Sequence, residues 1–106
     1  MAGVGKLLKQ AQKMQKQMEA AQEKLAEHSI QVSQAGGAVV VHVNGQGYFE
    51  SVVVDPEFLK EDKETVENTI LEAFRSASEQ AKAYSDEQME QITGGSGGIP
   101  GLPGLM

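Results

Sequence analysis

Hydrophobic and small residues recur through the first quarter of the chain with the spacing of one helix face. From Val4 onward the steps between them alternate between three and four residues, which is the 3.5-residue period of a coiled-coil seam. The seam positions are Val4, Leu7, Ala11, Met14, Met18, Ala21, Leu25 and His28. No glycine or proline follows Gly5 in this stretch, and Gln, Lys, Glu and Ala fill most other positions. The pattern predicts a helix over residues 3–28.

The predicted helix is too long to be covered by the rest of such a short chain. About 26 residues at 1.5 Å per residue give a helix of roughly 39 Å, which exceeds the width of a small domain. Part of the helix must therefore project, and a projecting apolar seam needs a partner. The simplest partner is the same helix of a second copy. We expect a homodimer whose seam includes Leu7, Ala11, Met14 and Met18.

After this helix the pattern changes to that of β-strands. Residues 29–33 alternate polar and apolar side chains, residues 38–43 are mostly β-branched, and residues 48–54 form a third run. The Asn-Gly-Gln-Gly turn at residues 44–47 joins the second and third runs into a hairpin. The first run completes an antiparallel meander over residues 29–55.

Two valine triplets, residues 39–41 and 52–54, make these strands apolar on both faces. One face of the sheet can be covered by a helix of the same chain, whereas the cover for the other face is unaccounted for. We expect a second copy to supply it. Val39 and Val41 are therefore placed on the dimer seam together with the residues of the first helix.

A second long helix is predicted over residues 62–93. Asp62 is placed to cap its start, and Gly94-Gly95 ends it. Residues 94–106 contain six glycines and two prolines, a composition that cannot repay the entropy of ordering, so we expect a flexible tail. The resulting order is α-β-β-β-α. It predicts a single α+β domain over residues 1–93 with a three-stranded antiparallel sheet.

Charge is segregated along the chain. The net charge is −6, yet residues 1–18 contain four lysines and no acidic residue, which leaves −10 for the remainder. Lys6, Lys9, Lys13 and Lys16 occupy helix positions c and f, opposite the seam. Cations near a helix N-terminus oppose the helix dipole, and Lys9 and Lys13 repel each other at i,i+4. Because local stability does not explain this layout, it indicates an anionic partner.

The sequence has no pattern typical of an enzyme or a cofactor site. It contains no cysteine, which excludes a disulfide framework and a thiolate zinc site. His28 and His42 have no metal-ligand spacing, although Glu50 could join His42 across the hairpin. The glycine-rich segments lack the context of a phosphate loop, and the carboxylates do not converge. We expect no catalytic residue, metal, cofactor or small-molecule substrate.

The lysine stripe has several interpretations: a solvated helix face, a grip on nucleic acid, or a contact for a protein or a membrane. The membrane interpretation is weakened because the seam lacks Trp and Phe and no apolar run approaches the ~20 residues of a spanning helix. The lack of an export signal favours the cytoplasm. A pI near 4.8 argues against nucleic acid in general, but the segregated charge leaves the lysine-bearing end attractive to phosphate.

These residues resemble the YbaB/EbfC family of bacterial nucleoid-associated proteins. The similarity covers nearly the whole chain in the right order, through LKQAQKMQ at 8–15, Gly36-Gly37, NGQG at 44–47, VDP at 54–56 and GIPGLPGL at 98–105. It implies an intertwined, tweezer-like homodimer with central sheets and long projecting terminal helices. It also implies binding of double-stranded DNA with low sequence specificity, localisation to the cytoplasmic nucleoid, and effects on DNA conformation, nucleoid organisation and gene expression.

Carried over to this sequence, the resemblance places the DNA-binding positions on the first helix. They are Lys6, Lys9, Lys13 and Lys16, with Gln10 and Gln12 between them. Arg75 and Lys82 of the last helix are interleaved with acidic residues and are weaker candidates. The alternative from a different class is a homodimeric adaptor module that grips an acidic partner protein. Base preference, affinity, and whether the projecting helices pair or splay have no signal in the sequence.

Overall fold

The structure, a computed structural model, describes residues 2–92. Its helices and strands are α1 (Ala2–Glu27), β1 (Ser29–Gln34), β2 (Val39–Asn44), β3 (Phe49–Val54) and α2 (Lys63–Ile92), with short 3-10 turns at Ala35–Gly37 and Phe58–Lys60. This order confirms the predicted α-β-β-β-α architecture. Residue 93, the predicted end of the second helix, and segment 94–106, predicted to be a flexible tail, lie outside the described residues.

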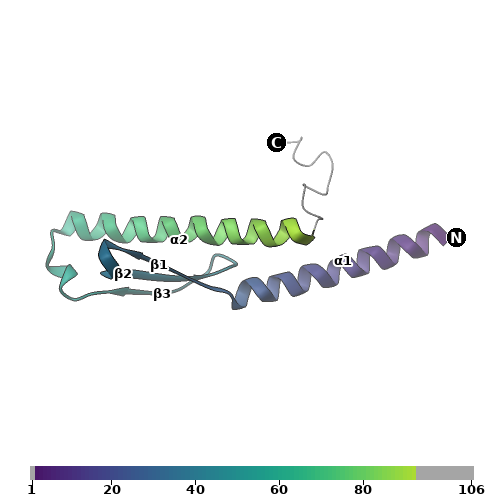
Figure 1. The fold of residues 1–106 in the computed structure, drawn as a ribbon, viewed down its shortest axis with the longest axis horizontal. Helices are drawn as coiled ribbons and strands as arrows, with labels where there is room; N and C mark the ends of the chain where they lie inside the picture. The colour runs from purple at the N-terminus through teal and green to yellow at the C-terminus, as the bar shows by residue number, and fades with distance from the viewer. Residues whose placement is uncertain (1, 93–106) are drawn as a thin grey trace, which may run out of the picture.

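α1 leaves the body of the molecule and gives the chain an elongated shape (Figure 1). The principal extents are 71 × 28 × 16 Å. The radius of gyration is 19.6 Å, against about 13 Å for a compact chain of this length. α2 lies along the sheet, whereas the N-terminal part of α1 runs past the end of α2. The prediction that part of the first helix projects is confirmed.

The three strands form an antiparallel sheet with β2 at its centre. Val41 of β2 pairs with Val32 of β1 on one side and with Val52 of β3 on the other. In the neighbouring row, Val40 lies between a serine of β1 and a valine of β3. Because successive residues of a strand point to opposite faces, these two rows lie on opposite faces of the sheet. The row of Val41 is the one that α2 covers.

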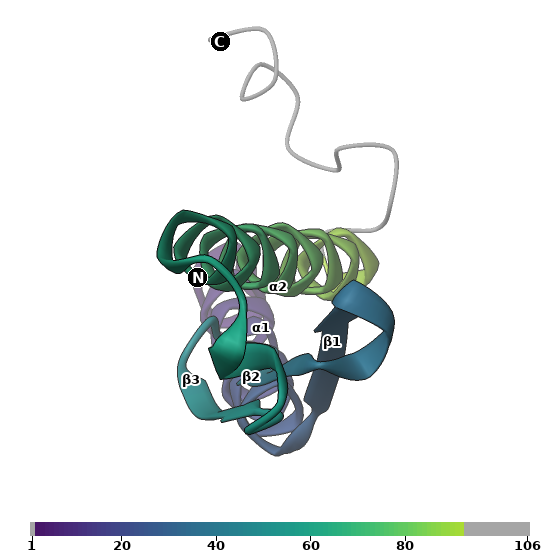
Figure 2. The same ribbon diagram turned by 90° about the vertical axis from the view of Figure 1, so that its left-hand side faces the viewer.

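The core lies between this face of the sheet and α2 (Figure 2). α2 contributes alanines four residues apart, which share one helix face and let the helix approach the sheet closely. The buried side chains are Val32, Val39, Val41, Val43, Ala73, Ala77 and Ala81. Val39 and Val41, placed on a dimer seam by the sequence pattern, are instead enclosed within their own chain at 0% exposure. A run of valines does not show which of its alternating residues face inward. In the structure, the valines that face inward are those packed with the buried alanines of α2.

β3 forms an apolar edge of the sheet that α2 covers only in part. α2 packs on β1 and β2, so Val52 stays 46% exposed although it lies on the same face as Val41. Val53, on the other face, is 57% exposed. Phe49 is 47% exposed, and its ring meets Phe74 edge-on with the ring centroids 4.8 Å apart. The opposite edge, β1, presents exposed serine and glutamine side chains instead.

The start of α2 is capped as the sequence predicts. The backbone amide of Thr65 donates a hydrogen bond to Asp62 Oδ2 over 3.4 Å, and that of Val66 donates to the Asp62 carbonyl over 3.0 Å. The first of these bonds satisfies one of the amide groups that the first turn of a helix leaves without partners, and the second is the first i→i−4 bond of the helix. The cap therefore fixes where α2 begins to cross the sheet.

Candidate functional site

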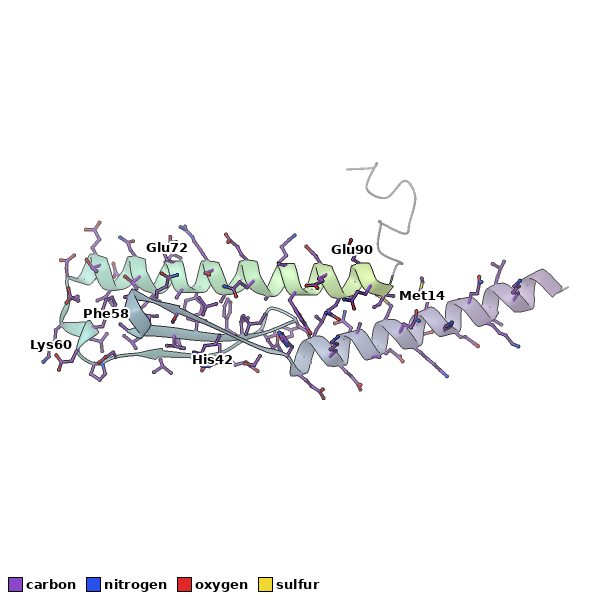
Figure 3. All side chains as sticks on the ribbon, viewed as in Figure 1. Met14, His42, Phe58, Lys60, Glu72 and Glu90 are labelled. Carbon is purple, nitrogen blue, oxygen red and sulfur yellow. The ribbon has the colours of Figure 1, made fainter. Side chains whose placement is uncertain are left out.

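The projecting part of α1 carries the residues predicted to bind DNA. Residues 3–20 are all exposed, and this segment is called the arm below. On its seam face Val4, Leu7 and Met14 are 60%, 67% and 46% exposed. Figure 3 shows that Met14 lies near the end of α2 along the long axis of the molecule. Despite these apolar side chains, no helix within residues 2–92 has the length and hydropathy needed to span a membrane.

The C-terminal end of the same seam is covered by the chain itself. Ala21 is 9% exposed and Leu25 is 1% exposed, because the last turns of α1 pack against α2 and the end of β2. The seam therefore divides after Met18, which is 39% exposed. The chain itself buries the seam after this division and leaves the part before it exposed, and that exposed part contains Leu7, Ala11, Met14 and Met18, the helix residues expected on a dimer seam.

The four lysines of the arm are all exposed and lie on one side of α1. Lys9, Lys13 and Lys16 line one shallow depression together with Gln12. Lys6 lies about one helical turn further toward the N-terminus. From Lys6 to Lys16 the stripe is roughly 15 Å long at 1.5 Å per residue, which is close to the rise of about four base pairs at 3.4 Å each. The length of the stripe is therefore comparable to the distance across several successive phosphates of one strand.

The two glutamines proposed for the site are both exposed on the arm. Gln12 shares the depression of the lysines, whereas Gln10 does not line it. Their amide groups can donate hydrogen bonds to phosphate oxygens without adding charge. By helical spacing each glutamine has two lysine neighbours three or four residues away, Lys6 and Lys13 for Gln10, and Lys9 and Lys16 for Gln12.

The arm lysines differ from the four cations that follow the sheet, because each of those four is paired with a carboxylate. Within residues 2–92, Lys6, Lys9, Lys13 and Lys16 are absent from the ion pairs that the structure forms. Those pairs are Lys60–Glu57 at 3.3 Å, Lys63–Glu67 at 3.5 Å, Arg75–Glu72 at 3.2 Å and Lys82–Asp86 at 3.3 Å. Arg75 and Lys82 each have a carboxylate beside them, so they attract phosphate less than the arm does.

The base of the arm is held by the Asn44–Gly47 turn, an arrangement that no sequence pattern predicts. The backbone amide of Gly45 donates a hydrogen bond to the Leu25 carbonyl over 2.8 Å. Asn44 Nδ2 donates to the Ala26 carbonyl over 3.4 Å, while Asn44 Oδ1 accepts hydrogen bonds from the backbone amides of Gln46 and Tyr48 at 2.9 and 3.0 Å. The Asn-Gly motif predicted a turn, but nothing local in the sequence shows which helix that turn touches.

The histidine and carboxylate considered as metal ligands bond to other groups. His42 Nδ1 lies 2.9 Å from Ser51 Oγ, and its Nε2 lies 3.2 Å from Gln31 Oε1. Glu50 accepts a hydrogen bond from the Ser29 hydroxyl over 3.2 Å. Figure 3 shows His42 on the side of the sheet away from α2. Within the described part of the chain, no group of three or more His, Cys, Asp and Glu side chains is placed to hold a metal ion.

The chain is similar to known proteins along nearly its whole length. The sequence profile of the YbaB/EbfC DNA-binding family matches residues 1–96. Nucleoid-associated proteins of Chloroflexus aurantiacus and Chloroflexus aggregans are each 36% identical to it over 90 residues, which cover 84% of this chain and 90% of each relative. The crystal structure of an uncharacterized protein from Helicobacter pylori has the same fold, with a TM-score of 0.76 and 22% identity over 89% of this chain and 97% of that one.

Proposed function

The chain belongs to the YbaB/EbfC DNA-binding family, and we propose that it is a bacterial nucleoid-associated protein that holds double-stranded DNA through the lysines of the arm. The grip is made on phosphates, so it has low sequence specificity. Binding of this kind acts on DNA conformation along the nucleoid, and through it on nucleoid organisation and gene expression.

One observation carries this proposal: the arm presents four lysines without ion-pair partners in the described chain, on a helix that stands clear of an acidic body. Phosphate contacts by lysine supply most of the affinity of sequence-independent DNA binding. The remainder of the chain carries −10, so it repels phosphate and confines the contact to the arm. Lysine is a point charge on a flexible stem, which suits phosphate better than it suits a base edge.

We further propose that the working unit is a homodimer. The chain leaves two apolar surfaces open, the β3 edge with Phe49 and Val53 and the arm seam of residues 7–18. An unpaired strand edge is a template for another chain, and here the edge at β3 is apolar while the edge at β1 is polar. A second copy covers the β3 edge and the seam residues Leu7, Ala11, Met14 and Met18. The dimer then offers two arms to one duplex.

The proposal is tested by binding of fluorescently labelled duplexes of unrelated sequence at about 50 mM salt, where phosphate contacts are strong. We expect the parent chain to bind all duplexes with similar affinity and to sediment at twice its mass of 11.3 kDa. A variant with Lys6, Lys9, Lys13 and Lys16 changed to Gln should lose affinity for every duplex. If the parent ignores duplex DNA but binds polyglutamate, the adaptor alternative replaces the proposal.

A further inference from the structure

The direction of the arm is decided at a very short junction. A single residue, His28, separates the end of α1 from the start of β1. Its backbone amide donates to the carbonyls of Lys24 and Leu25 over 3.1 and 3.3 Å, which closes the last turn of the helix. Because the connection is one residue long, a small change at this junction is transmitted to the whole arm.

The end of α1 lacks the usual local cap. The last four carbonyls of a helix have no partner within it, and a following glycine commonly brings the chain round to satisfy them. Here the next residues are His28 and Ser29, and the partner comes from the distant hairpin. The amide of Gly45 lies between two carbonyls at this end, 2.8 Å from that of Leu25 and 3.0 Å from that of His28. The turn thus acts as the cap of α1.

Residue 45 must be a glycine because a side chain there would have no room, and not because its backbone conformation requires glycine. Its φ is outside the left-handed region, unlike that of Gly47, which is +92°. A Cβ atom on Gly45 would lie 2.8 Å from the Leu25 carbonyl oxygen, 3.0 Å from Leu25 Cα and 3.0 Å from Tyr84 Cδ2. Two of these three atoms belong to the backbone of α1, so the clash cannot be relieved by a side-chain rotation. A Cβ atom on Gly47 would have no heavy atom within 4 Å.

We propose that Gly45, enclosed between the backbone of Leu25 and the ring of Tyr84, is a positioning residue that locks the direction of the arm relative to the body. An added Cβ atom must push α1 away from α2 or break the hydrogen bond to Leu25. Over a helix of roughly 39 Å, a tilt of about 10° displaces the tip by about 7 Å. That displacement is comparable to two base-pair steps, so the lysines of two arms no longer meet one duplex together. This consequence for DNA rests on the function proposed above.

The glycines of the turn provide a matched pair of variants. Gly45→Ala adds a methyl group against α1, whereas Gly47→Ala strains a left-handed backbone in open space. The chain has no cysteine, so spin labels can be attached at Gln15→Cys on the arm and Glu79→Cys on α2. Labelled chain is diluted into an excess of unlabelled chain, so that pulsed electron resonance reports only distances within one chain.

We expect Gly45→Ala to shift or broaden the distance between arm and body by several ångströms, while Gly47→Ala keeps the distance of the parent. We also expect Gly45→Ala, but not Gly47→Ala, to weaken duplex binding by tenfold or more with every lysine still present. If Gly45→Ala does not fold, Tyr84→Leu serves as the test, since it removes the ring that encloses Gly45 on the α2 side.

An unchanged distance in the folded variant overturns the proposal. A changed distance with full DNA affinity overturns the consequence for DNA, because the direction of the arm would then have no bearing on the grip. The distance measurement needs no DNA. A parent chain that fails to bind duplexes therefore refutes the proposed function, while the distances still decide whether Gly45 sets the direction of the arm.

Discussion

The imidazole ring of His28 stacks on the phenol ring of Tyr84, with the ring centroids 3.9 Å apart and the planes within 9° of parallel. His28 is the residue between α1 and β1, and Tyr84 belongs to α2. The stack therefore joins the connecting residue to the helix that covers the sheet. Together with the Gly45 amide, it ties the base of the arm to both layers of the body.

Loss of this stack should destabilise the fold without removing the arm. We expect His28→Ala to lower the free energy of unfolding by about 0.5–1.5 kcal/mol, the range found for aromatic pairs beyond their buried area. Urea denaturation at fixed protein concentration measures the change. His28→Phe keeps a flat ring at this position and should restore most of the loss. Equal stability of His28→Ala and the parent would show that the stack contributes nothing.

The lysine stripe makes a quantitative prediction about salt. A dimer offers at most eight arm lysines, and about half of them meeting phosphates gives a log–log slope near −3.6, or roughly 150-fold weaker binding between 50 and 200 mM salt. Changing Lys9 and Lys13 to Gln should weaken binding to every sequence alike. It should also make the slope shallower by about one unit for each phosphate that the variant no longer neutralises.

The matched control for this variant is Lys60→Gln with Lys63→Gln, which removes the same charge. Both of these residues lie in ion pairs, and Figure 3 shows Lys60 at the end of the molecule opposite the arm. We expect this control to bind DNA with the slope of the parent. If both double variants lose affinity equally, net charge and not the arm governs binding.

Substitutions within one row of the sheet can test dimerisation separately from folding. Ser33, Val40 and Val53 lie side by side across β1, β2 and β3. Because Val53 is 57% exposed, Val53→Asp leaves its charge in water and should keep the circular dichroism of the parent. If a second copy covers the β3 edge, the same change should give monomers in sedimentation equilibrium. Ser33→Asp adds an equal charge at the polar edge and should leave the dimer intact.

Close packing of α2 on the sheet predicts sensitivity to added volume. Ala77 is fully buried against the valines of the core, whereas Ala83 of the same helix is exposed. Ala77→Leu should lower the free energy of unfolding by about 1–3 kcal/mol, because a well-packed core accommodates extra methylene groups only with strain. Ala83→Leu should stay within about 0.5 kcal/mol of the parent. Thermal melts followed by circular dichroism measure both, and similar melting of the two variants would contradict the close packing of α2.

The elements of the fold were predictable because each has a periodic local pattern. The three-and-four spacing from Val4 to Leu25 predicted α1, and the valine runs around Asn44 predicted the hairpin. The same patterns could not show what covers each face. The apolar residues of α1 have the same spacing near Leu25, which the chain buries, and near Leu7, which the chain leaves exposed. In the valine triplet, Val41 faces α2 only because the alanines of α2 lie opposite it.

The arrangement at the base of the arm was even less visible in the sequence. Asn44 and Gly45 have the composition of a hairpin turn whether or not another element touches it. The need for glycine at residue 45 comes from atoms of Leu25 and Tyr84, which are distant in sequence. A local pattern reports the conformation of its own residues. It carries no information on which remote backbone comes within 3 Å of them.

The exposure of residues 3–20 also determines how α1 forms. The first turn of a helix is costly and later residues add with little further free energy, so helices shorter than about 12–15 residues are marginal alone in water. In α1 the body supplies that first turn, because Ala21 and Leu25 are buried. The helix therefore propagates outward from its C-terminal end toward Val4. We expect warming to shorten the helix from the tip inward, so that Lys6 is the first lysine to leave the stripe.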